Sequence, residues 1–360
     1  MLGGGMMEKR IEKARSFLKE KELDAIFIYS YENRRYFSGF SGSNGYLLIT
    51  NDYCGLITDQ RYTEQAKEQS PHFEIITQGI DPFSTIQDVF KGKDISKIGF
   101  ESESVSVHLF NRLKSIFIEY EWFPLTKELL NIRKVKDDAE IEIIRKAIAI
   151  SDQAFAELIP LLKPGMTEKE VAVELEYLMG KLGHEGPAFG TIVAAGNRAA
   201  LPHAIPSSKI VNNNEFLLID YGVKYMGYMS DMTRTIVLGS PNEDLKKYYD
   251  IVHEALEKSI EAVKPGMTGH ELDAAARNVF IREGLEQYSL RGLGHGVGLQ
   301  IHENPRVVLD SEEILEPGMI FTIEPGLYVP GKVGVRVEDI VLVREDGCEI
   351  LTGTPRHIYI

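Results

Sequence analysis

The sequence predicts an α+β protein in which a larger domain built from two related halves follows a smaller α/β domain. Three observations support this prediction. The chain has 360 residues, enough for two domains or slightly more at about 150 residues each. Helix and strand patterns alternate through the first third, and a short segment occurs twice in the remaining two-thirds. We therefore expect domains at residues 1–125 and 126–360.

The first third shows the periodicities of a small α/β domain. Glu8–Leu23 has apolar residues at helical spacing, and Asn51-Asp52 is a typical turn between two apolar runs. Further helices are expected near Tyr62–Glu68 and Ser106–Ile116. The expected strands are Ala25–Tyr29, Tyr46–Ile49, Tyr53–Ile57 and Ile98–Phe100.

The later part of the chain contains an internal repeat. A long helix should run from Asp137 towards Leu161 and stop at Pro164-Gly165. The segment Leu162–Thr167 then recurs as Val263–Thr268, differing only at its first position. Each repeat ends in a Thr with a Glu three residues later, which is a capping box that opens a helix. The strand-like stretches that follow are Phe216–Tyr221, Tyr228–Leu238, Met319–Tyr328 and Gly334–Val343. We expect two halves about a pseudo-twofold axis, with a site at their junction.

Composition and charge narrow the classes of function. Asp and Glu (54) outnumber Lys and Arg (40), giving a net charge of −14 that disfavours nucleic-acid binding. The two cysteines, Cys54 and Cys348, lie far apart, so we expect no disulfide framework and a reducing, cytoplasmic location. No apolar run approaches the roughly 18 residues of a membrane span. Met1–Met7 lacks the pattern of a secretory signal, and we expect it to be a frayed leader or the product of an upstream start.

Two aspartates end and begin apolar stretches. Asp220 closes Phe216–Ile219, and Asp231 precedes a second strand-like run. A hairpin that turns at Tyr225-Met226 would place the two carboxylates opposite each other. Carboxylates side by side in an apolar setting repel unless a cation lies between them. Either residue alone would more often be an ordinary Asp at a strand end. It is the pairing of the two carboxylates that indicates a cation site.

A histidine lies among alternating glycines. His295 is in Gly294–Gly298, and His302 follows shortly after. Glycine lets backbone or ligand approach closely. A phosphate-binding loop is the rival interpretation, but the strand–loop–helix context that it requires is missing.

Two glutamates complete the set. Glu324 follows an apolar run and precedes Pro325-Gly326, while Glu338 lies two residues after Arg336. On one strand, Arg336 and Glu338 would point to the same face. A solvent-facing Arg/Glu pair is the alternative when these two residues are considered alone.

Together these residues form an oxygen-rich set with a single imidazole: Asp220, Asp231, His295, Glu324 and Glu338. A closed structural zinc site would use Cys and His instead. The set fits two divalent ions that share carboxylates, with Mn²⁺ expected first and Co²⁺, Fe²⁺ or Zn²⁺ left open. Such a pair lowers the pKa of a bridging water, so that hydroxide is available near neutral pH, and polarises a carbonyl group.

With their neighbours, these residues resemble the pita-bread metallopeptidases, peptidase family M24. The stretch Gly292–Glu303 is similar to the signature of the proline-specific branch, aminopeptidase P and prolidase, and so are Leu201–His203 and Val335–Asp339. This resemblance covers roughly residues 132–345. The first 125 residues, with Tyr36–Phe40 and Thr58–Tyr62, resemble the creatinase-type N-terminal domain of that branch.

The resemblance implies roles for individual residues. The five residues above would bind two metal ions per chain, and Glu324 would also move the proton from water to the leaving amine. His203 and His302 would hold the scissile carbonyl and stabilise the tetrahedral intermediate. Arg336 would buttress the site, and Tyr328 matches a position behind the metal ligands. Arg291 departs from the family pattern, which has His or Ala there, and puts substrate preference in question.

The resemblance implies an exopeptidase that removes an N-terminal residue ahead of proline, as aminopeptidase P does. The alternative is an Xaa-Pro dipeptidase (prolidase) that accepts dipeptides only. A non-catalytic peptide-binding relative is a remote third possibility, since such proteins typically lose ligands that this chain keeps. Methionine aminopeptidase usually lacks the extra domain, and creatinase lacks the full metal set. We expect peptides with proline at the second position as substrates, no nucleic-acid or membrane partner, and, as in the family, a homodimer.

Overall fold

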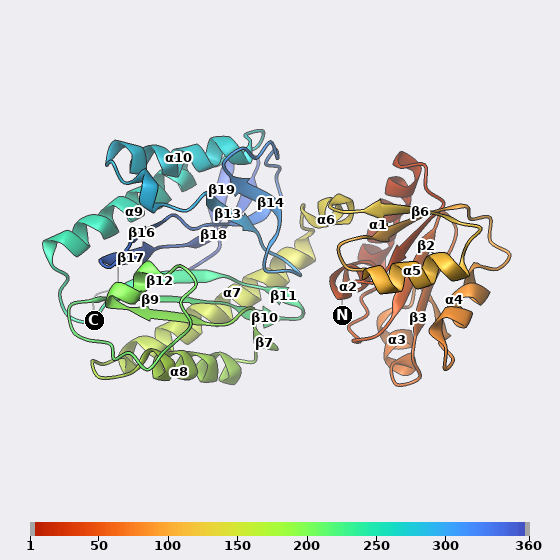
Figure 1. The fold of residues 1–360 in the computed structure, drawn as a ribbon, viewed down its shortest axis with the longest axis horizontal. Helices are drawn as coiled ribbons and strands as arrows, with labels where there is room; N and C mark the ends of the chain where they lie inside the picture. Colours follow the sequence, from red (N-terminus) through yellow and green to blue (C-terminus); the bar gives the residue numbers. More distant parts are fainter. Residues whose placement is uncertain (1–3, 357–360) are drawn as a thin grey trace. The chain divides into compact units, whose positions relative to one another are not determined.

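The computed structural model describes residues 4–356, which divide between Arg133 and Lys134 into two compact units (Figure 1). Both units mix helices and sheets, so the predicted α+β class is confirmed. The first unit includes a helix beyond residue 125, and the domain boundary expected there stays a prediction. None of the helices between residues 4 and 356 is long and apolar enough to cross a bilayer.

The first unit is a six-stranded mixed sheet with the order β4-β3-β2-β1-β5-β6. Central strand β1 pairs antiparallel with β2 and parallel with β5. Phe27 on β1 packs in one core with Phe90 and Leu113 from two helices. The strands are β1 (Ala25–Ile28), β2 (Tyr46–Thr50), β3 (Cys54–Thr58), β4 (Glu74–Thr77), β5 (Lys97–Glu101) and β6 (Glu121–Leu125).

The helices of this unit agree only partly with the prediction. The first helix begins at Gly4 rather than Glu8, so residues 4–7, which we expected to be frayed, are helical; residues 1–3 lie outside the described residues. Tyr31–Ser38 was not predicted, because its polar composition shows no apolar periodicity. The helices are α1 (Gly4–Glu20), α2 (Tyr31–Ser38), α3 (Thr63–Gln69), α4 (Pro82–Phe90), α5 (Val107–Ile116) and α6 (Glu128–Arg133).

The first half of the second unit packs two helices on a three-stranded sheet. Phe155 from the long helix and Leu175 from the next one share a core with Ile219 and Ile236 of the sheet. The sheet order is β12-β9-β8, and a second small sheet has the order β11-β10-β7. The elements are α7 (Asp138–Leu158), η1 (Ile159–Leu161), α8 (Glu168–Lys181), β7 (Gly186–Pro187), β8 (Ile192–Ala195), η2 (Gly196–Ala200), β9 (Phe216–Tyr221), β10 (Val223–Tyr225), β11 (Tyr228–Met229) and β12 (Met232–Val237).

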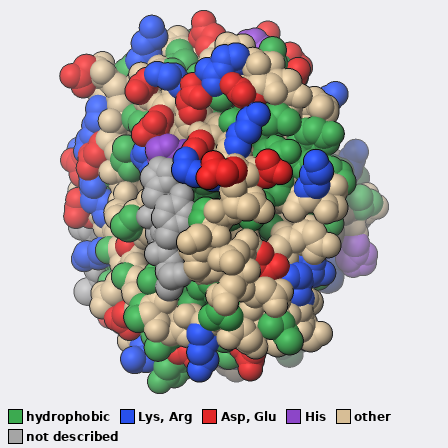
Figure 2. All heavy atoms as spheres, turned by 90° about the vertical axis from the view of Figure 1, so that its left-hand side faces the viewer, with side chains coloured by type: hydrophobic (Ala, Val, Ile, Leu, Met, Phe, Trp, Pro, Cys, Tyr) green, Lys and Arg blue, Asp and Glu red, His purple; other side chains and the backbone are tan. Residues whose placement is uncertain are grey.

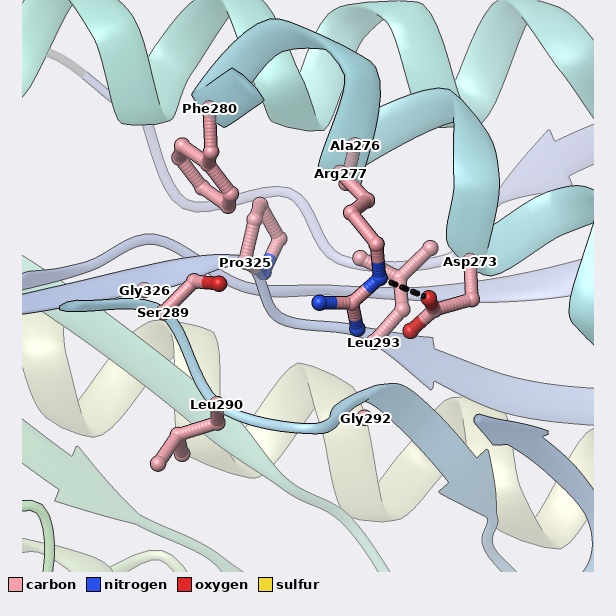
Figure 3. A pocket seen from close by; sticks show the side chains of 10 residues that line it. All are labelled: Asp273, Ala276, Arg277, Phe280, Ser289, Leu290, Gly292, Leu293, Pro325 and Gly326. Carbon is pink, nitrogen blue, oxygen red and sulfur yellow. Dashed lines mark hydrogen bonds and ion pairs between the residues drawn. The ribbon is translucent and has the colours of Figure 1, made fainter. Parts of the chain in front are cut away.

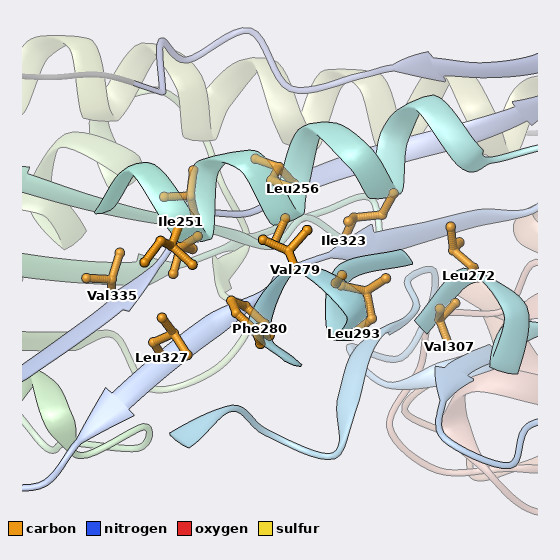
Figure 4. Packing of buried hydrophobic residues seen from close by; sticks show 14 of the residues in the cluster. Ile251, Leu256, Leu272, Val279, Phe280, Leu293, Val307, Ile323, Leu327 and Val335 are labelled. Atoms are coloured by element: carbon orange, nitrogen blue, oxygen red, sulfur yellow. The ribbon is translucent and has the colours of Figure 1, made fainter. Parts of the chain in front are cut away.

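The second half repeats this plan with a larger sheet. Leu256 and Phe280 come from its two helices and pack against Leu293, Ile323 and Val335 of the strands (Figure 4). The strand order is β14-β13-β15-β18-β19, with β16-β17 as a separate pair. The elements are α9 (Glu243–Ala262), α10 (Gly269–Arg282), η3 (Glu286–Tyr288), β13 (Gly292–Gly296), β14 (Glu303–Val308), β15 (Ile320–Ile323), β16 (Gly326–Val329), β17 (Val333–Arg336), β18 (Asp339–Arg344) and β19 (Gly347–Ile350).

The internal repeat is confirmed as a structural repeat. Thr167 and Thr268 each cap a helix through a complete capping box with Glu170 and Glu271. Within the second unit, α7 and α8 lie on one side of the strands and α9 and α10 on the other (Figure 1). The strands of both halves therefore lie between two helical layers.

The predicted hairpin was wrong by one residue at its turn. Met226 and Gly227 both have positive φ, which is the geometry of a type I′ turn centred on this pair. The strands accordingly pair Asp220 with Thr233 rather than with Asp231. Asp231 lies in the break between β11 and β12, immediately before the main pairing begins.

The expected strands after Met319 and after Gly334 are each interrupted. Gly334–Val343 divides into β17, which pairs with β16, and β18, which pairs with β15 and β19. Glu338 lies between β17 and β18, and its N–H donates to the Thr233 carbonyl oxygen at 3.2 Å. The chain therefore passes from one sheet to another at Glu338, which was predicted as a site residue.

Candidate metal centre

Three carboxylates from both halves meet at the junction of the repeat. Asp220 comes from β9, Asp231 precedes β12, and Glu338 follows β17. One oxygen from each lies within 4.8 Å of the others, and all three side chains are buried. Sequence reasoning predicted this meeting of Asp220 and Asp231, although it assigned them the wrong strand register.

Two oxygens of this cluster have no hydrogen-bond partner within residues 4–356. Asp220 Oδ1 and Glu338 Oε1 are buried and accept no hydrogen bond from the described residues. Burial, followed by the charges of Glu338 and Asp220, raises the pKa of Asp231 well above its usual range. Burial, followed by neighbouring carboxylates, likewise raises the pKa of Glu338. The protein therefore does not by itself stabilise three ionised carboxylates here, and unpaired buried oxygens are the donors that a divalent cation needs.

His295 presents one ring nitrogen to the same cluster. Its Nε2 lies 3.5 Å from Asp231 Oδ2 and 3.2 Å from Glu324 Oε1. Its Nδ1 lies 3.1 Å from the Gly296 carbonyl oxygen, which can only accept, so the proton belongs on Nδ1. That tautomer leaves the lone pair of Nε2 for a metal ion.

Glu324 differs from the other carboxylates in the direction of its pKa shift. Burial opposes its ionisation, but the hydrogen bond and charge that His295 supplies when its Nε2 is protonated as well, with the charge of Arg336, outweigh burial and lower the pKa of Glu324. Thr322 Oγ1 donates to Glu324 Oε1 at 3.0 Å and accepts from the His295 N–H at 3.1 Å. Glu324 is therefore a carboxylate that Thr322 holds in place and whose neighbours favour its ionised form.

Arg336 connects the carboxylates to the wall of the site. Its guanidinium donates to Asp220 Oδ2 and to the Tyr328 hydroxyl. Its Nε donates to Thr233 Oγ1 at 2.9 Å, and its Nη1 reaches the Pro202 carbonyl oxygen at 3.4 Å. Arg336 thus orients Asp220 and contacts the residue that precedes His203.

The glycines around His295 permit close strand packing. A Cβ at Gly294 would collide with the Thr322 carbonyl group, and one at Gly296 would collide with the Asn304 carbonyl group. Both glycines lie on β13 between β14 and β15. The expectation of close backbone approach is confirmed, and the glycines form part of a sheet rather than a phosphate-binding loop.

A cavity of about 380 Å³ opens over the cluster. His203 and His302 both line it and are exposed, and the two rings of His302 and His295 have centroids 4.3 Å apart. Burial and then the charge of His295 lower the pKa of His302, which favours its neutral form. The remaining lining is largely apolar: Phe189, Ile192, Ala204, Ile205, Pro206, Leu290 and Ile301.

A much smaller pocket lies between α10 and the segment that leads into β13 (Figure 3). Arg277 and Asp273 form an ion pair of 2.8 Å on α10 beside Ser289 and Pro325. Its volume of about 10 Å³ holds roughly one water at most. This pocket is too small for a substrate, and the larger cavity is the candidate site.

The C-terminal segment supports the centre from behind. Buried Arg234 donates to the Thr354 carbonyl oxygen at 2.7 Å, to the Pro355 carbonyl oxygen at 3.1 Å and to the Glu338 carbonyl oxygen. It also pairs with Asp339 at 3.0 Å. The backbone of Glu338 is thereby connected through one guanidinium to the last described residues of the chain.

Comparison with known proteins identifies the family. Residues 142–345 match metallopeptidase family M24, and residues 10–135 match the creatinase/prolidase N-terminal domain. The chain belongs to metallopeptidase family M24. It is 40% identical over 98% of its length to an Xaa-Pro dipeptidase from Pyrococcus furiosus, of which it covers 100%.

Two solved structures of this family are similar over nearly the whole M24 chain. One is an Xaa-Pro dipeptidase from Bacillus anthracis, with a TM-score of 0.96 at 37% identity, covering 98% of this chain and 100% of that one. The other is an X-Pro aminopeptidase from Thermotoga maritima, with a TM-score of 0.90 at 40% identity, covering 97% and 99%. The resemblance to the proline-specific branch and the pita-bread fold are confirmed, and this enzyme is a metallopeptidase.

The structure brings the residues predicted for the M24 site to one cavity, although their roles stay predictions. Asp220, Asp231, His295, Glu324, Arg336, His203 and His302 all line it. Glu338 belongs to the buried carboxylate cluster beneath the cavity. Tyr328 contacts the site by accepting a hydrogen bond from Arg336. Arg291 is exposed and does not line the cavity.

Sequence reasoning missed the hydroxyl groups that hold these side chains. Thr233 Oγ1 accepts from Arg336 and donates to Glu338 Oε2 at 2.7 Å, and Thr322 holds Glu324 and His295. Thr322 lies two residues before Glu324, so the strand alternation that predicted Arg336 and Glu338 on one face could have found it.

Proposed function

We propose that the chain is a metal-dependent Xaa-Pro dipeptidase. The sequence alone favoured aminopeptidase P, but the Pyrococcus and Bacillus relatives, both named Xaa-Pro dipeptidase, support the alternative better. The observation that carries the proposal is the pair of unpartnered carboxylate oxygens, on Asp220 and Glu338, at the junction of the two halves. The cavity has a volume of about 380 Å³. Ligand pockets usually measure about 300–1,000 Å³, so this cavity is near the lower end of that range and suits a short substrate.

Two divalent ions would be held by Asp220, Asp231, His295, Glu324 and Glu338. When bound, such ions lower the pKa of water and polarise a carbonyl group. We favour Mn²⁺ because the donors are mostly carboxylate oxygens. The free thiols Cys54 and Cys348 support a reducing, cytoplasmic location, while the homodimer rests on the family resemblance alone.

The protein side chains would divide the remaining work. Glu324, kept ionised by His295 and Arg336, would accept a proton from the attacking water and deliver it to the proline nitrogen. His203 and His302 would donate to the carbonyl oxygen as negative charge develops on it. An Xaa–Pro bond has no N–H, and none of these contacts requires one.

The choice between dipeptidase and aminopeptidase depends on substrate length. We would compare Ala-Pro, Ala-Pro-Ala and Met-Ala-Ser with Mn²⁺ and with a chelator. The proposal expects chelator-sensitive release of proline from Ala-Pro and no cleavage of either tripeptide. Efficient cleavage of Ala-Pro-Ala would contradict the dipeptidase proposal and support aminopeptidase P. Cleavage of Met-Ala-Ser would show that the enzyme does not require proline at the second position.

A further inference from the structure

A fully buried carboxylate outside the metal cluster holds the segment that carries His203. Glu168, in the first turn of α8, is 0% exposed. It accepts from the Ala195 N–H at 2.9 Å, from the Ser207 N–H at 2.9 Å and from Ser207 Oγ at 2.6 Å. Arg198 Nε lies 3.1 Å from both of its oxygens. One side chain therefore binds both ends of the segment from Ala195 to Ser207.

This segment forms one wall of the cavity. His203 and Ile205 both line the cavity and are exposed to it or to solvent. Arg198, which pairs with Glu168, also donates from Nη2 to the Ile205 carbonyl oxygen at 2.8 Å. The contacts of Glu168 thus extend through Arg198 to within two residues of His203.

The second half of the repeat has no counterpart of this carboxylate. Glu168 and Gly269 each follow the capping Thr, and their N–H groups donate to equivalent carbonyl oxygens, those of Lys209 and Glu313, at 3.0 and 2.9 Å. A Cβ at Gly269 would collide with the Arg306 carbonyl oxygen. The helix start itself therefore needs no Glu, and the side chain of Glu168 serves the segment that it binds.

We propose that Glu168 is a positioning residue for the peptidase reaction, acting through His203. This inference rests on the proposed function, in which His203 contacts the scissile carbonyl. A carboxylate is required because it only accepts hydrogen bonds, and all of the groups around Glu168 donate. The amide nitrogen of Gln at this position would face at least one of those donors.

The direct test is hydrogen exchange of residues 196–206 in metal-free protein. Glu168→Gln is compared with Glu170→Gln, which changes an exposed carboxylate on the same helix turn. We expect exchange in this segment to rise about tenfold or more in Glu168→Gln only, because charged hydrogen bonds are lost. Exchange equal to wild type would overturn the proposal. Ser207→Ala keeps the carboxylate and removes one donor, so it gives the same test, with a smaller expected rise, if Glu168→Gln does not fold.

Kinetics then separate positioning from general stabilisation. Glu168→Gln should lower kcat/KM about 10- to 100-fold, mostly through kcat. In a His203→Ala background the same substitution should have little further effect. A full additional loss there would contradict action through His203. If the wild type cleaves no Xaa-Pro peptide, the proposed function fails, while the exchange comparison still decides whether Glu168 holds the segment.

Discussion

Thr233 Oγ1 donates to Glu338 Oε2 at 2.7 Å, while Glu338 Oε1 has no partner among the described residues. This hydroxyl fixes one carboxylate oxygen and leaves the other available to a metal ion. Thr233→Val should therefore weaken Mn²⁺ binding about 10- to 100-fold, the usual cost of losing a hydrogen-bond partner of a ligand. Titration calorimetry with Mn²⁺ measures this change. Thr235→Val, on the same strand but bonded to the Arg336 main chain, should weaken binding less, and an equal loss would contradict the assignment.

Removal of the Asp231 carboxylate should abolish most of the thermal stabilisation that added metal gives. The wild-type protein should gain thermal stability when Mn²⁺ is added, because a ligand that binds only the folded state stabilises it. Asp231→Asn should lose most of that gain and should not be destabilised in the absence of metal, because burial and like charges already disfavour an ionised Asp231. Differential scanning fluorimetry with and without chelator tests this, and Glu312→Gln, an exposed carboxylate, is the matched control. An undiminished Mn²⁺ shift in Asp231→Asn would remove this residue from the ligand set.

Glu324 should be required for turnover even if metal remains bound. Glu324→Gln removes the base and should reduce kcat for Ala-Pro about 10²- to 10⁴-fold. Metal content, measured by elemental analysis of the same sample, separates this loss from loss of metal. A variant that retains metal and near wild-type kcat would exclude Glu324 as the proton carrier.

A buried ion pair next to His302 should contribute strongly to stability. Lys136 Nζ lies 2.8 Å from Glu303 Oε1, and the two side chains are 1% and 3% exposed. Lys136→Met removes this cation from the buried carboxylate and should lower the free energy of unfolding by about 3–5 kcal/mol. Lys134→Met, which breaks a more exposed pair with Glu316, should cost about 1 kcal/mol or less. Urea unfolding of both variants measures the difference, and equal effects would show that burial does not strengthen the Lys136 pair.

Both thiols should react slowly in the folded protein. Burial raises the pKa of Cys348 to about 11, and burial, opposed by Arg15, raises that of Cys54. A raised thiol pKa means that the reactive thiolate is scarce at pH 8 and increases as pH rises towards the folded pKa. A thiol-specific chromogenic reagent should therefore label neither cysteine quickly at pH 8, and both in urea. Rapid native labelling of Cys348 would contradict the raised pKa.

The site was predictable because its residues break an apolar pattern. Asp220 and Glu324 each follow an apolar run, and His295 lies among glycines, so their chemistry shows directly in the sequence. The strand register was not predictable in the same way. It depends on positive φ at Met226 and Gly227, and a non-glycine residue such as Met226 rarely adopts that conformation.

Long-range polar contacts could not be predicted from local sequence patterns. Glu168 looks like an ordinary acidic residue in a first helical turn, where the helix dipole favours it. Only the fold shows that Ser207 and Arg198 converge on it. The short helix Tyr31–Ser38 was missed for a related reason. Its Arg34 is buried because the guanidinium donates to backbone carbonyl oxygens, and such contacts leave no apolar periodicity in the sequence.

The bonds of Arg234 to Thr354 and Pro355 have a consequence for synthesis of the protein on the ribosome. Until those residues leave the exit tunnel, the guanidinium lacks two of its carbonyl acceptors, and the backbone at Glu338 lacks its full support. Domains generally fold from the N-terminus as they emerge, but the support of this centre is completed only after Thr354 and Pro355 have emerged. The nascent chain therefore passes through a stage in which Glu338, the last of the predicted metal ligands along the chain, has emerged but its backbone is not yet fully supported.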